Sequence, residues 1–189
     1  MAKDRVVFVP WNDNQAGKFG TDGDWSNRQK DNTHHKRTWT TYFLNTAGKP
    51  LAEVGMGMSA RIHIFGHGVP PGQDNTKTYP DVDTAAPVTV TELADMLVEK
   101  GLKKKYLGTI VCDICYSGLG TPSFAKQLAR ELYKRGYVCA VMGHHGAIFP
   151  VYFRYDAVKD NKYEHRIVEK LDGSLVKSKN AQERFWGFT

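Results

Sequence analysis

The chain has 189 residues, 41% of them apolar, which is enough for one domain with a substantial core. Its 26 Lys and Arg residues outnumber 20 Asp and Glu residues and give a net charge of +6, but the basic residues are dispersed along the sequence. This dispersal is typical of solvated surface and argues against a nucleic-acid partner, while an anionic activator stays open.

The first third of the chain predicts two strands separated by a long loop. Residues 5–11 (RVVFVPW) and 38–44 (TWTTYFL) are rich in β-branched and aromatic residues, which is typical of strands. Residues 12–37 between them are rich in Gly, Asp, Asn, Lys and His and show no apolar periodicity. A stretch of this length without regular structure is unusual inside a domain, so we expect a flexible functional loop or lid at about 12–37.

The middle of the chain predicts strands that alternate with helices. Apolar runs predict strands at 59–65, 106–115 and 137–142. Thr89 followed by Glu92 has the pattern of a capping box, so a crossover helix is expected to begin there and to end near Gly101.

A second helix is expected after the strand at 106–115. Thr121-Pro122 should open it and Gly136 should end it. Its inward face is predicted to consist of Phe124, Ala125, Leu128, Ala129, Leu132 and Tyr133. Further along, Asp172-Gly173 lies between two strand-like segments and predicts a tight hairpin.

These elements predict the fold class. We expect an α/β protein, a single domain over residues 1–189 built as a three-layer α/β/α sandwich. Its central sheet should be mostly parallel, with an antiparallel hairpin near the C-terminus.

Two segments carry the candidate chemistry. RIHIFGHG ends in His67-Gly68, and GTIVCDICYSG places Cys115 before Tyr116-Ser117-Gly118. Each is an apolar strand that stops at a reactive side chain beside a glycine, and the carboxyl ends of parallel strands meet at one edge of a sheet. The pattern predicts a cysteine nucleophile with a histidine partner.

The two motifs resemble those of the caspase-like (clan CD) cysteine peptidases, which include caspases, metacaspases, legumains, gingipains and the self-cleaving domains of large bacterial toxins. Residues 113–118 look closest to the metacaspase-type Asp-x-Cys-x-Ser-Gly block, while the Gln-Ala-Cys-Arg-Gly string of animal caspases is absent. The likeness covers the segment between about Met58 and Gly146. It implies a caspase-like fold and a thiol endopeptidase that needs no cofactor, acts on peptides or proteins and is able to process itself.

The resemblance also implies roles for single residues. Cys115 would attack the scissile carbonyl, His67 would transfer protons, and the backbone N–H groups of Gly68 and Cys115 would stabilise the oxyanion, with no carboxylate required as a third member. The aspartate that matches Asp113 binds Arg or Lys in metacaspase-like relatives, so cleavage after Arg or Lys is expected. Further candidates for the substrate cleft are Ser117, His144 and His145, each with a plain structural role as the alternative.

Three other functions fit parts of the same pattern. A non-catalytic caspase-like module would keep the fold without cleavage, and a thiol redox protein would use Cys112 with Cys115. Peptide transfer through the same acyl-enzyme is the third alternative. A metal site at His63 and His67 is not expected, because side chains four apart on a strand stand roughly 13 Å apart.

The three cysteines do not form a secreted disulfide framework, and the N-terminal apolar stretch is too short for a signal peptide or a membrane span. We therefore expect a protein without membrane contact in the cytoplasm. Export by a signal-less secretion system stays open.

Overall fold

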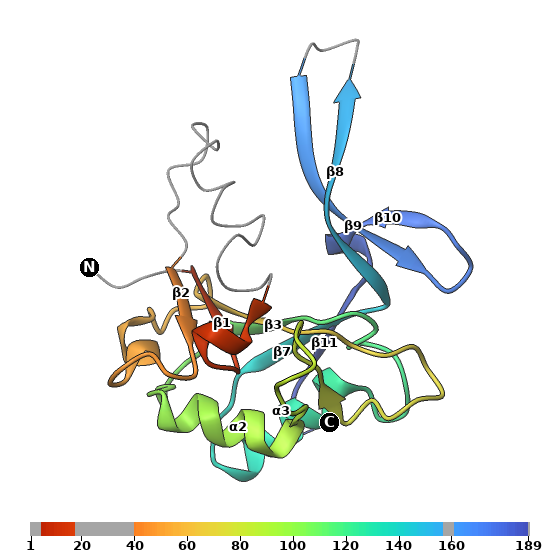
Figure 1. The fold of residues 1–189 in the computed structure, drawn as a ribbon. Helices are drawn as coiled ribbons and strands as arrows, with labels where there is room; N and C mark the ends of the chain where they lie inside the picture. Colours follow the sequence, from red (N-terminus) through yellow and green to blue (C-terminus); the bar gives the residue numbers. More distant parts are fainter. Residues whose placement is uncertain (1–4, 18–39, 157–160, 189) are drawn as a thin grey trace.

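A six-stranded sheet forms the centre of the protein (Figure 1). The structure is a computed structural model, and it describes residues 5–17, 40–156 and 161–188. The sheet has the order β11-β7-β6-β3-β1-β2. Its strands are β1 (Arg5–Val9), β2 (Thr40–Phe43), β3 (Arg61–Phe65), β6 (Thr109–Asp113), β7 (Ala140–His144) and β11 (Gln182–Phe185).

Five of the six strands run parallel, and β11 alone pairs with its neighbour β7 in the antiparallel sense. The predicted α/β class with a mostly parallel sheet is therefore confirmed. Because β3, β6 and β7 run in the same direction, their carboxyl ends lie at one edge; β3 and β6 are followed there by irregular segments, and β7 by the single residue His145 before β8.

The two faces of the sheet differ in chemistry. Ile62 and Ile64 of β3, with Cys112 of β6, are fully buried in the main apolar core together with residues of both helices. Alternate residues of a strand point to opposite faces. The other face therefore receives His63 and Asp113, which are also buried.

Helix α2 (Val90–Glu99) connects β3 to β6, and helix α3 (Phe124–Lys134) connects β6 to β7 (Figure 1). The predicted capping box is confirmed, since the Thr89 side chain accepts from the N–H of Glu92. Helix α3 begins later than expected, because Ser123 and not Thr121-Pro122 provides the N-cap. The helices contact each other, and Arg135 forms a 2.7 Å ion pair with Asp95 of α2.

Tyr133 does not belong to the inward face of α3, where the helical pattern placed it. Its surface is 46% exposed, and its ring meets Phe188 edge-on, with 6.2 Å between centroids. The C-terminal segment packs closely there, because a Cβ on Gly187 would lie 2.3 Å from Cβ of Tyr133. The pattern of α3 alone does not show that a distant segment binds this side of the helix.

The C-terminal part of the chain forms a long hairpin of β8 (Gly146–Asp156) and β9 (Asn161–Lys170), which projects from the body in Figure 1. Strand β10 (Leu175–Lys177) pairs with β9 across the Asp172-Gly173 turn, where Gly173 has φ +78°, so the predicted hairpin is confirmed. A 3-10 turn, η4 (Ser178–Asn180), then leads into β11.

Short elements complete the described chain. They are the 3-10 turns η1 (Asp13–Gln15) and η3 (Pro50–Glu53), and a two-stranded sheet of β4 (Lys77–Thr78) with β5 (Val88–Thr89). The expected loop at 12–37 thus contains a turn at its start, and its part from residue 18 onward lies outside the described residues. No helix in the described part of the chain is both long and apolar enough to cross a membrane.

Candidate active site

The ends of β3 and β6 bring the two predicted motifs together. Phe65 and Asp113 are partners in the parallel register, so His67 and Cys115 each lie two residues beyond a matched pair. A Cβ on Gly68 would stand only 1.9 Å from the carbonyl oxygen of Cys115. The backbone of Gly68 therefore packs directly on the Cys115 loop, and the expectation that these two segments meet is confirmed.

Backbone amides surround the Cys115 sulfur. The N–H of Ile148, at the base of the β8–β9 hairpin, donates to Sγ over 3.2 Å. Burial raises the pKa of the Cys115 thiol, whereas hydrogen bonds from the N–H groups of Ile148, Cys115 and Gly68 act to lower it. The two amides expected to form an oxyanion hole, those of Gly68 and Cys115, thus lie near enough to the sulfur to act on its pKa.

The backbone at His67 is held by a neighbouring segment. His67 and Tyr79 exchange two backbone hydrogen bonds of 2.8 and 3.0 Å, and the Thr78 hydroxyl donates to the carbonyl of His67 over 3.0 Å. Gly66 makes this approach feasible, because a Cβ there would lie 2.1 Å from Oγ1 of Thr78. The backbone position of His67 is therefore set by the segment 78–79 as well as by β3.

Asp81 is a carboxylate partner of His67 that the sequence did not suggest. Its Oδ1 lies 3.0 Å from Nε2 of His67. Pro70, Pro71, Gly72 and Pro80 mark the surrounding loop as irregular, and nothing local shows that Tyr79 pairs with His67. The only available signal was the presence of an acidic residue in a loop that leaves the same strand end as the histidine.

The residues after Cys115 form a sharp turn that packs on β7. Tyr116 adopts φ +57°, an unfavourable value for a residue with a side chain, and its N–H donates to the carbonyl of Gly146 over 2.8 Å. The buried Ser117 hydroxyl donates to the carbonyl of Cys112 and accepts from the N–H of His144, both at 3.0 Å. Ser117 is thus a link between two strand ends, which is the structural alternative to its predicted place in the substrate cleft.

Asp113 is buried between two imidazoles. One carboxylate oxygen lies 2.7 Å from Nδ1 of His63 in β3, and the other lies 3.2 Å from Nε2 of His144 in β7. The Asp113 side chain is only 1% exposed. With these two partners the carboxylate is closed to solvent, so the expected preference for Arg or Lys stays a prediction.

The two adjacent histidines predicted near the cleft have different surroundings. His144 is completely buried, so it supports Asp113 and does not line an open cleft. His145 is partly exposed, and its Nε2 lies 2.9 Å from a carboxylate oxygen of Glu183 in β11. A Cβ on Gly118 would stand 2.8 Å from the ring of His145, so this imidazole does lie beside the turn that follows Cys115.

The other cysteines and histidines of the described chain form neither a second reactive thiol site nor a metal site. Cys112 is fully buried, and its burial raises the pKa of its thiol far above the ordinary value. Cys139 is also buried and free. Among the residues that the structure describes, no three His, Cys, Asp or Glu side chains are grouped as metal ligands would be.

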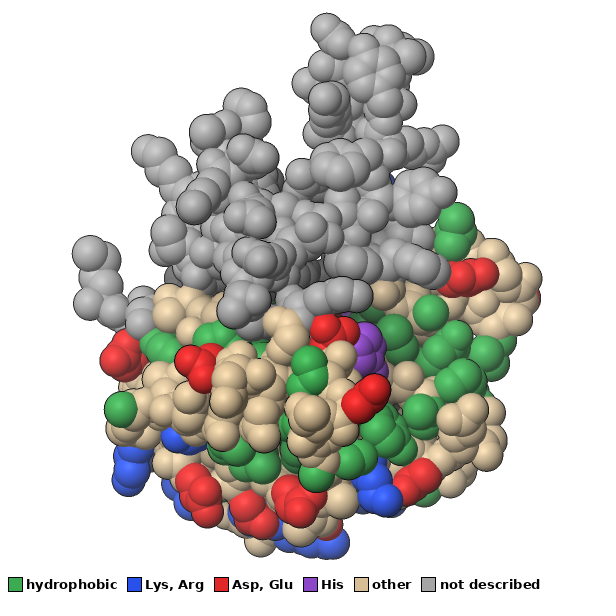
Figure 2. All heavy atoms as spheres, viewed as in Figure 1, with side chains coloured by type: hydrophobic (Ala, Val, Ile, Leu, Met, Phe, Trp, Pro, Cys, Tyr) green, Lys and Arg blue, Asp and Glu red, His purple; other side chains and the backbone are tan. Residues whose placement is uncertain are grey.

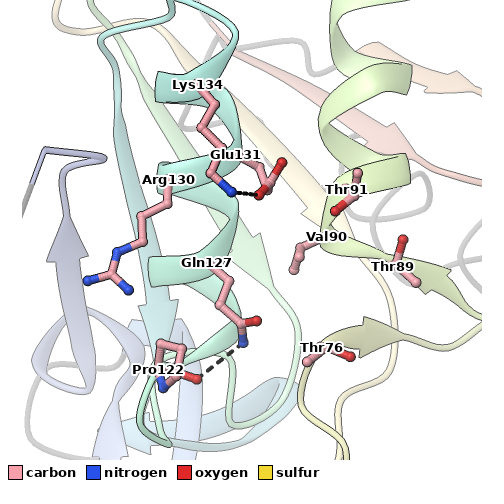
Figure 3. Close-up of a pocket in the computed structure, with 9 residues that line it drawn as sticks. All are labelled: Thr76, Thr89, Val90, Thr91, Pro122, Gln127, Arg130, Glu131 and Lys134. Carbon is pink, nitrogen blue, oxygen red and sulfur yellow. Dashed lines mark hydrogen bonds and ion pairs between the residues drawn. The ribbon is translucent and has the colours of Figure 1, made fainter.

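A pocket of about 470 Å³ lies on the helical side, between the beginning of α2 and the outer side of α3 (Figure 3). Its lining contains neither Cys115 nor His67. Three of its polar side chains already have partners in the lining: Glu131 pairs with Lys134 at 2.6 Å, and Gln127 donates to the carbonyl of Pro122. On the face of the molecule drawn in Figure 2, the visible Lys and Arg side chains lie near the lower edge of the molecule, and Asp and Glu side chains lie among them.

Comparison with protein-family models finds no match, and comparison with curated proteins finds no similar sequence. The resemblance to caspase-like peptidases therefore depends on the motifs at His67 and Cys115 and on their geometry.

Proposed function

We propose that this protein is a cysteine endopeptidase that cleaves peptide bonds with Cys115 as nucleophile and His67 as proton donor and acceptor. The observation that carries the proposal is the close packing of Gly68 on Cys115, with the N–H of Ile148 donating to Sγ over 3.2 Å. Backbone that approaches the sulfur this closely is well placed to donate to the oxyanion that forms when the sulfur attacks a carbonyl.

The expected reaction has two stages. His67 accepts the thiol proton of Cys115, and Sγ attacks the scissile carbonyl carbon, while the N–H groups of Gly68 and Cys115 donate to the oxygen that becomes negative. When the carbon–nitrogen bond breaks, His67 gives its proton to the leaving amine and a thioester remains. Water then attacks the thioester, His67 takes the proton of that water, and the thiolate leaves as the carboxylic acid forms.

The raised pKa of Cys115 affects the order of these events. Because burial disfavours the anion, the thiol stays largely protonated in the free protein near neutral pH. Deprotonation is therefore expected to accompany substrate attack and to depend on His67. This favours a peptidase whose thiol reacts slowly with simple alkylating reagents and faster with peptide-based ones.

The buried position of Cys112 weighs against the redox alternative. This thiol lies fully buried in the apolar core within β6, whereas Cys115 lies in the turn after that strand, and both cysteines are free. A redox pair needs both sulfurs within bonding distance and one of them accessible.

Digestion of a peptide library by the intact chain, read by mass spectrometry, tests the proposal. Wild type should produce cleaved peptides, Cys115→Ala should produce none, and His67→Ala should lower kcat by roughly 100-fold or more. Cys139→Ala is the matched control, because it removes a buried thiol distant from the motifs and should keep the activity. Cleavage by Cys115→Ala at the wild-type rate would contradict the proposal.

The same library reads the residue before the scissile bond. Arg or Lys at that position is the expectation from the metacaspase-like motif, and matched fluorogenic peptides that differ only there would quantify it. A wild-type chain that neither cleaves the library nor reacts with a peptide-based thiol probe would favour the non-catalytic module.

A further inference from the structure

His67 combines an exposed side chain with a fixed contact at one ring nitrogen. The side chain is 50% exposed, so the apolar core does not hold its orientation. Nε2 lies 3.0 Å from Oδ1 of Asp81, whose own side chain is only 14% exposed. The ring is therefore tied on one side to a carboxylate that is itself enclosed by protein.

The position of Asp81 is set by two segments. Tyr79, two residues earlier, is bonded to the backbone of His67, which brings the 79–81 segment alongside the strand end. The other carboxylate oxygen packs on bare backbone, because a Cβ on Gly17 would lie 2.6 Å from Oδ2 of Asp81. The Asp81 carboxylate is therefore packed against Gly17 on one side and faces His67 on the other.

The carboxylate of Asp81 determines which ring nitrogen of His67 carries a proton. A carboxylate only accepts hydrogen bonds, so Nε2 of His67 must carry the proton that lies between the two groups. If His67 acts on Cys115 as proposed above, proton exchange with the thiol and the leaving amine then falls to the other ring nitrogen, Nδ1. The negative charge of Asp81 also stabilises the imidazolium that forms when His67 takes the thiol proton.

We propose that Asp81 is a positioning residue for His67, which holds the ring through Nε2 and directs Nδ1 to the reaction. This role rests on the proposed peptidase function. It extends the two-residue arrangement implied by the sequence to a Cys115–His67–Asp81 triad in which Asp81 never contacts substrate.

Peptide cleavage by the intact chain, measured for Asp81→Ala, Asp81→Glu and the control Asp83→Ala, tests this role. Asp83 is an exposed acid on the same loop, two residues further on. Asp81→Ala should lower kcat by roughly 100-fold with little change in KM, because general acid–base catalysis contributes on that scale. Added formate should restore part of the lost rate by occupying the vacated site, and Asp81→Glu should retain more activity than Asp81→Ala.

A second measurement does not depend on activity. The nitrogen chemical shifts of the His67 ring report which nitrogen carries the proton, so they should show the Nε2–H form in wild type and a loss of that fixed form in Asp81→Ala. Thermal unfolding of both variants checks that the fold is kept.

The outcomes separate the two proposals. A wild type that cleaves, with Asp81→Ala equal to Asp83→Ala, would overturn the role of Asp81 alone. That role is also overturned if formate has no effect and the ring shifts do not change. A wild type that neither cleaves nor labels at Cys115 would overturn the peptidase function, and the ring shifts would then decide the His67–Asp81 pairing by themselves.

Discussion

Gly68 is the residue on which the candidate site most depends for its shape. Its hydrogen atom faces the carbonyl of Cys115 where any other side chain would collide with backbone, and its N–H is one of the donors near Sγ. The need for glycine here is a matter of space and of access to a backbone donor.

Gly68→Ala should therefore damage the site more than its small size suggests. The new Cβ would lie 1.9 Å from the Cys115 oxygen, so the two strand ends must separate. A displacement of about 1 Å in a catalytic site is expected to lower kcat/KM roughly 100-fold. Gly57→Ala is the control, because no atom lies within 4 Å of a Cβ at that position. Equal kcat/KM for the two variants, measured on one fluorogenic peptide, would contradict this account of Gly68.

Among the elements, the ends of β3, β6 and β7 are joined by polar contacts on the face opposite the helices. Asp113 at the end of β6 binds His63 of β3 and His144 of β7, and Ser117 bonds to the backbone of both β6 and β7. These buried hydrogen bonds fix the relative positions of the strands that carry His67 and Cys115. Buried polar networks of this kind are costly to break, because each remaining group loses its partner in a dry environment.

Asp113→Ala should consequently destabilise the fold whatever its effect on substrate choice. Removing the carboxylate takes away a partner from two buried imidazoles, and breaking a buried pair in this way costs about 3 kcal/mol. Asp95→Ala breaks an ion pair whose carboxylate is half exposed, so it should cost much less. Urea unfolding at neutral pH measures both, and a smaller loss for Asp113→Ala than for Asp95→Ala would be the contrary result.

Structure that depends on local interactions is predictable from this sequence. The Thr89 and Glu92 capping box and the turn at Asp172-Gly173 form where the residue pattern predicts them, and a shorter strand, Thr109–Asp113, forms within the predicted segment 106–115. Parallel strand order also made the approach of the Gly68 and Cys115 segments predictable, because matched strand ends share an edge. The site could therefore be predicted from the apolar periodicity of the strands and from the alternation of strands and helices along the chain.

Contacts between segments distant in the chain were not predictable in the same way. The pairing of Tyr79 with His67 brings in Asp81, and the C-terminal Phe188 covers Tyr133. The N–H of Ile148 reaches Cys115 because the base of the β8–β9 hairpin lies beside the Cys115 turn. Each depends on how a loop or hairpin returns to the body, for which no local periodicity exists.

At the scale of the whole molecule, the last strand in the sequence completes the central sheet, and the cysteines form no disulfide. Strand β11 returns from beyond the hairpin to cover the edge of β7, so the core of the sheet is complete only when residues 182–185 are in place. That core contains Cys112 and Cys139, both free and buried. A buried thiol resists ionisation in the folded state and ionises readily once the chain unfolds.

This difference predicts a loss of stability in alkali. Burial raises the pKa of Cys139 to about 12 and raises that of Cys112 as well, against an ordinary value of about 8.5 in the unfolded chain. The contribution of the two buried thiols to the free energy of unfolding is fully present at pH values below the thiol pKa of the unfolded chain. Above it the unfolded state binds fewer protons than the folded one, so the free energy of unfolding falls with rising pH, by about 1.4 kcal/mol per pH unit for each thiol.

Urea unfolding between pH 9 and 11 measures this dependence, and Cys139→Ala isolates one thiol. The variant has a smaller side chain in the core, so its absolute stability also changes, but the size of the cavity does not vary with pH. The slope of unfolding free energy against pH should therefore become less steep by about 1.4 kcal/mol per pH unit. Equal slopes for wild type and Cys139→Ala would mean that this thiol ionises alike in both states, against the burial seen in the core.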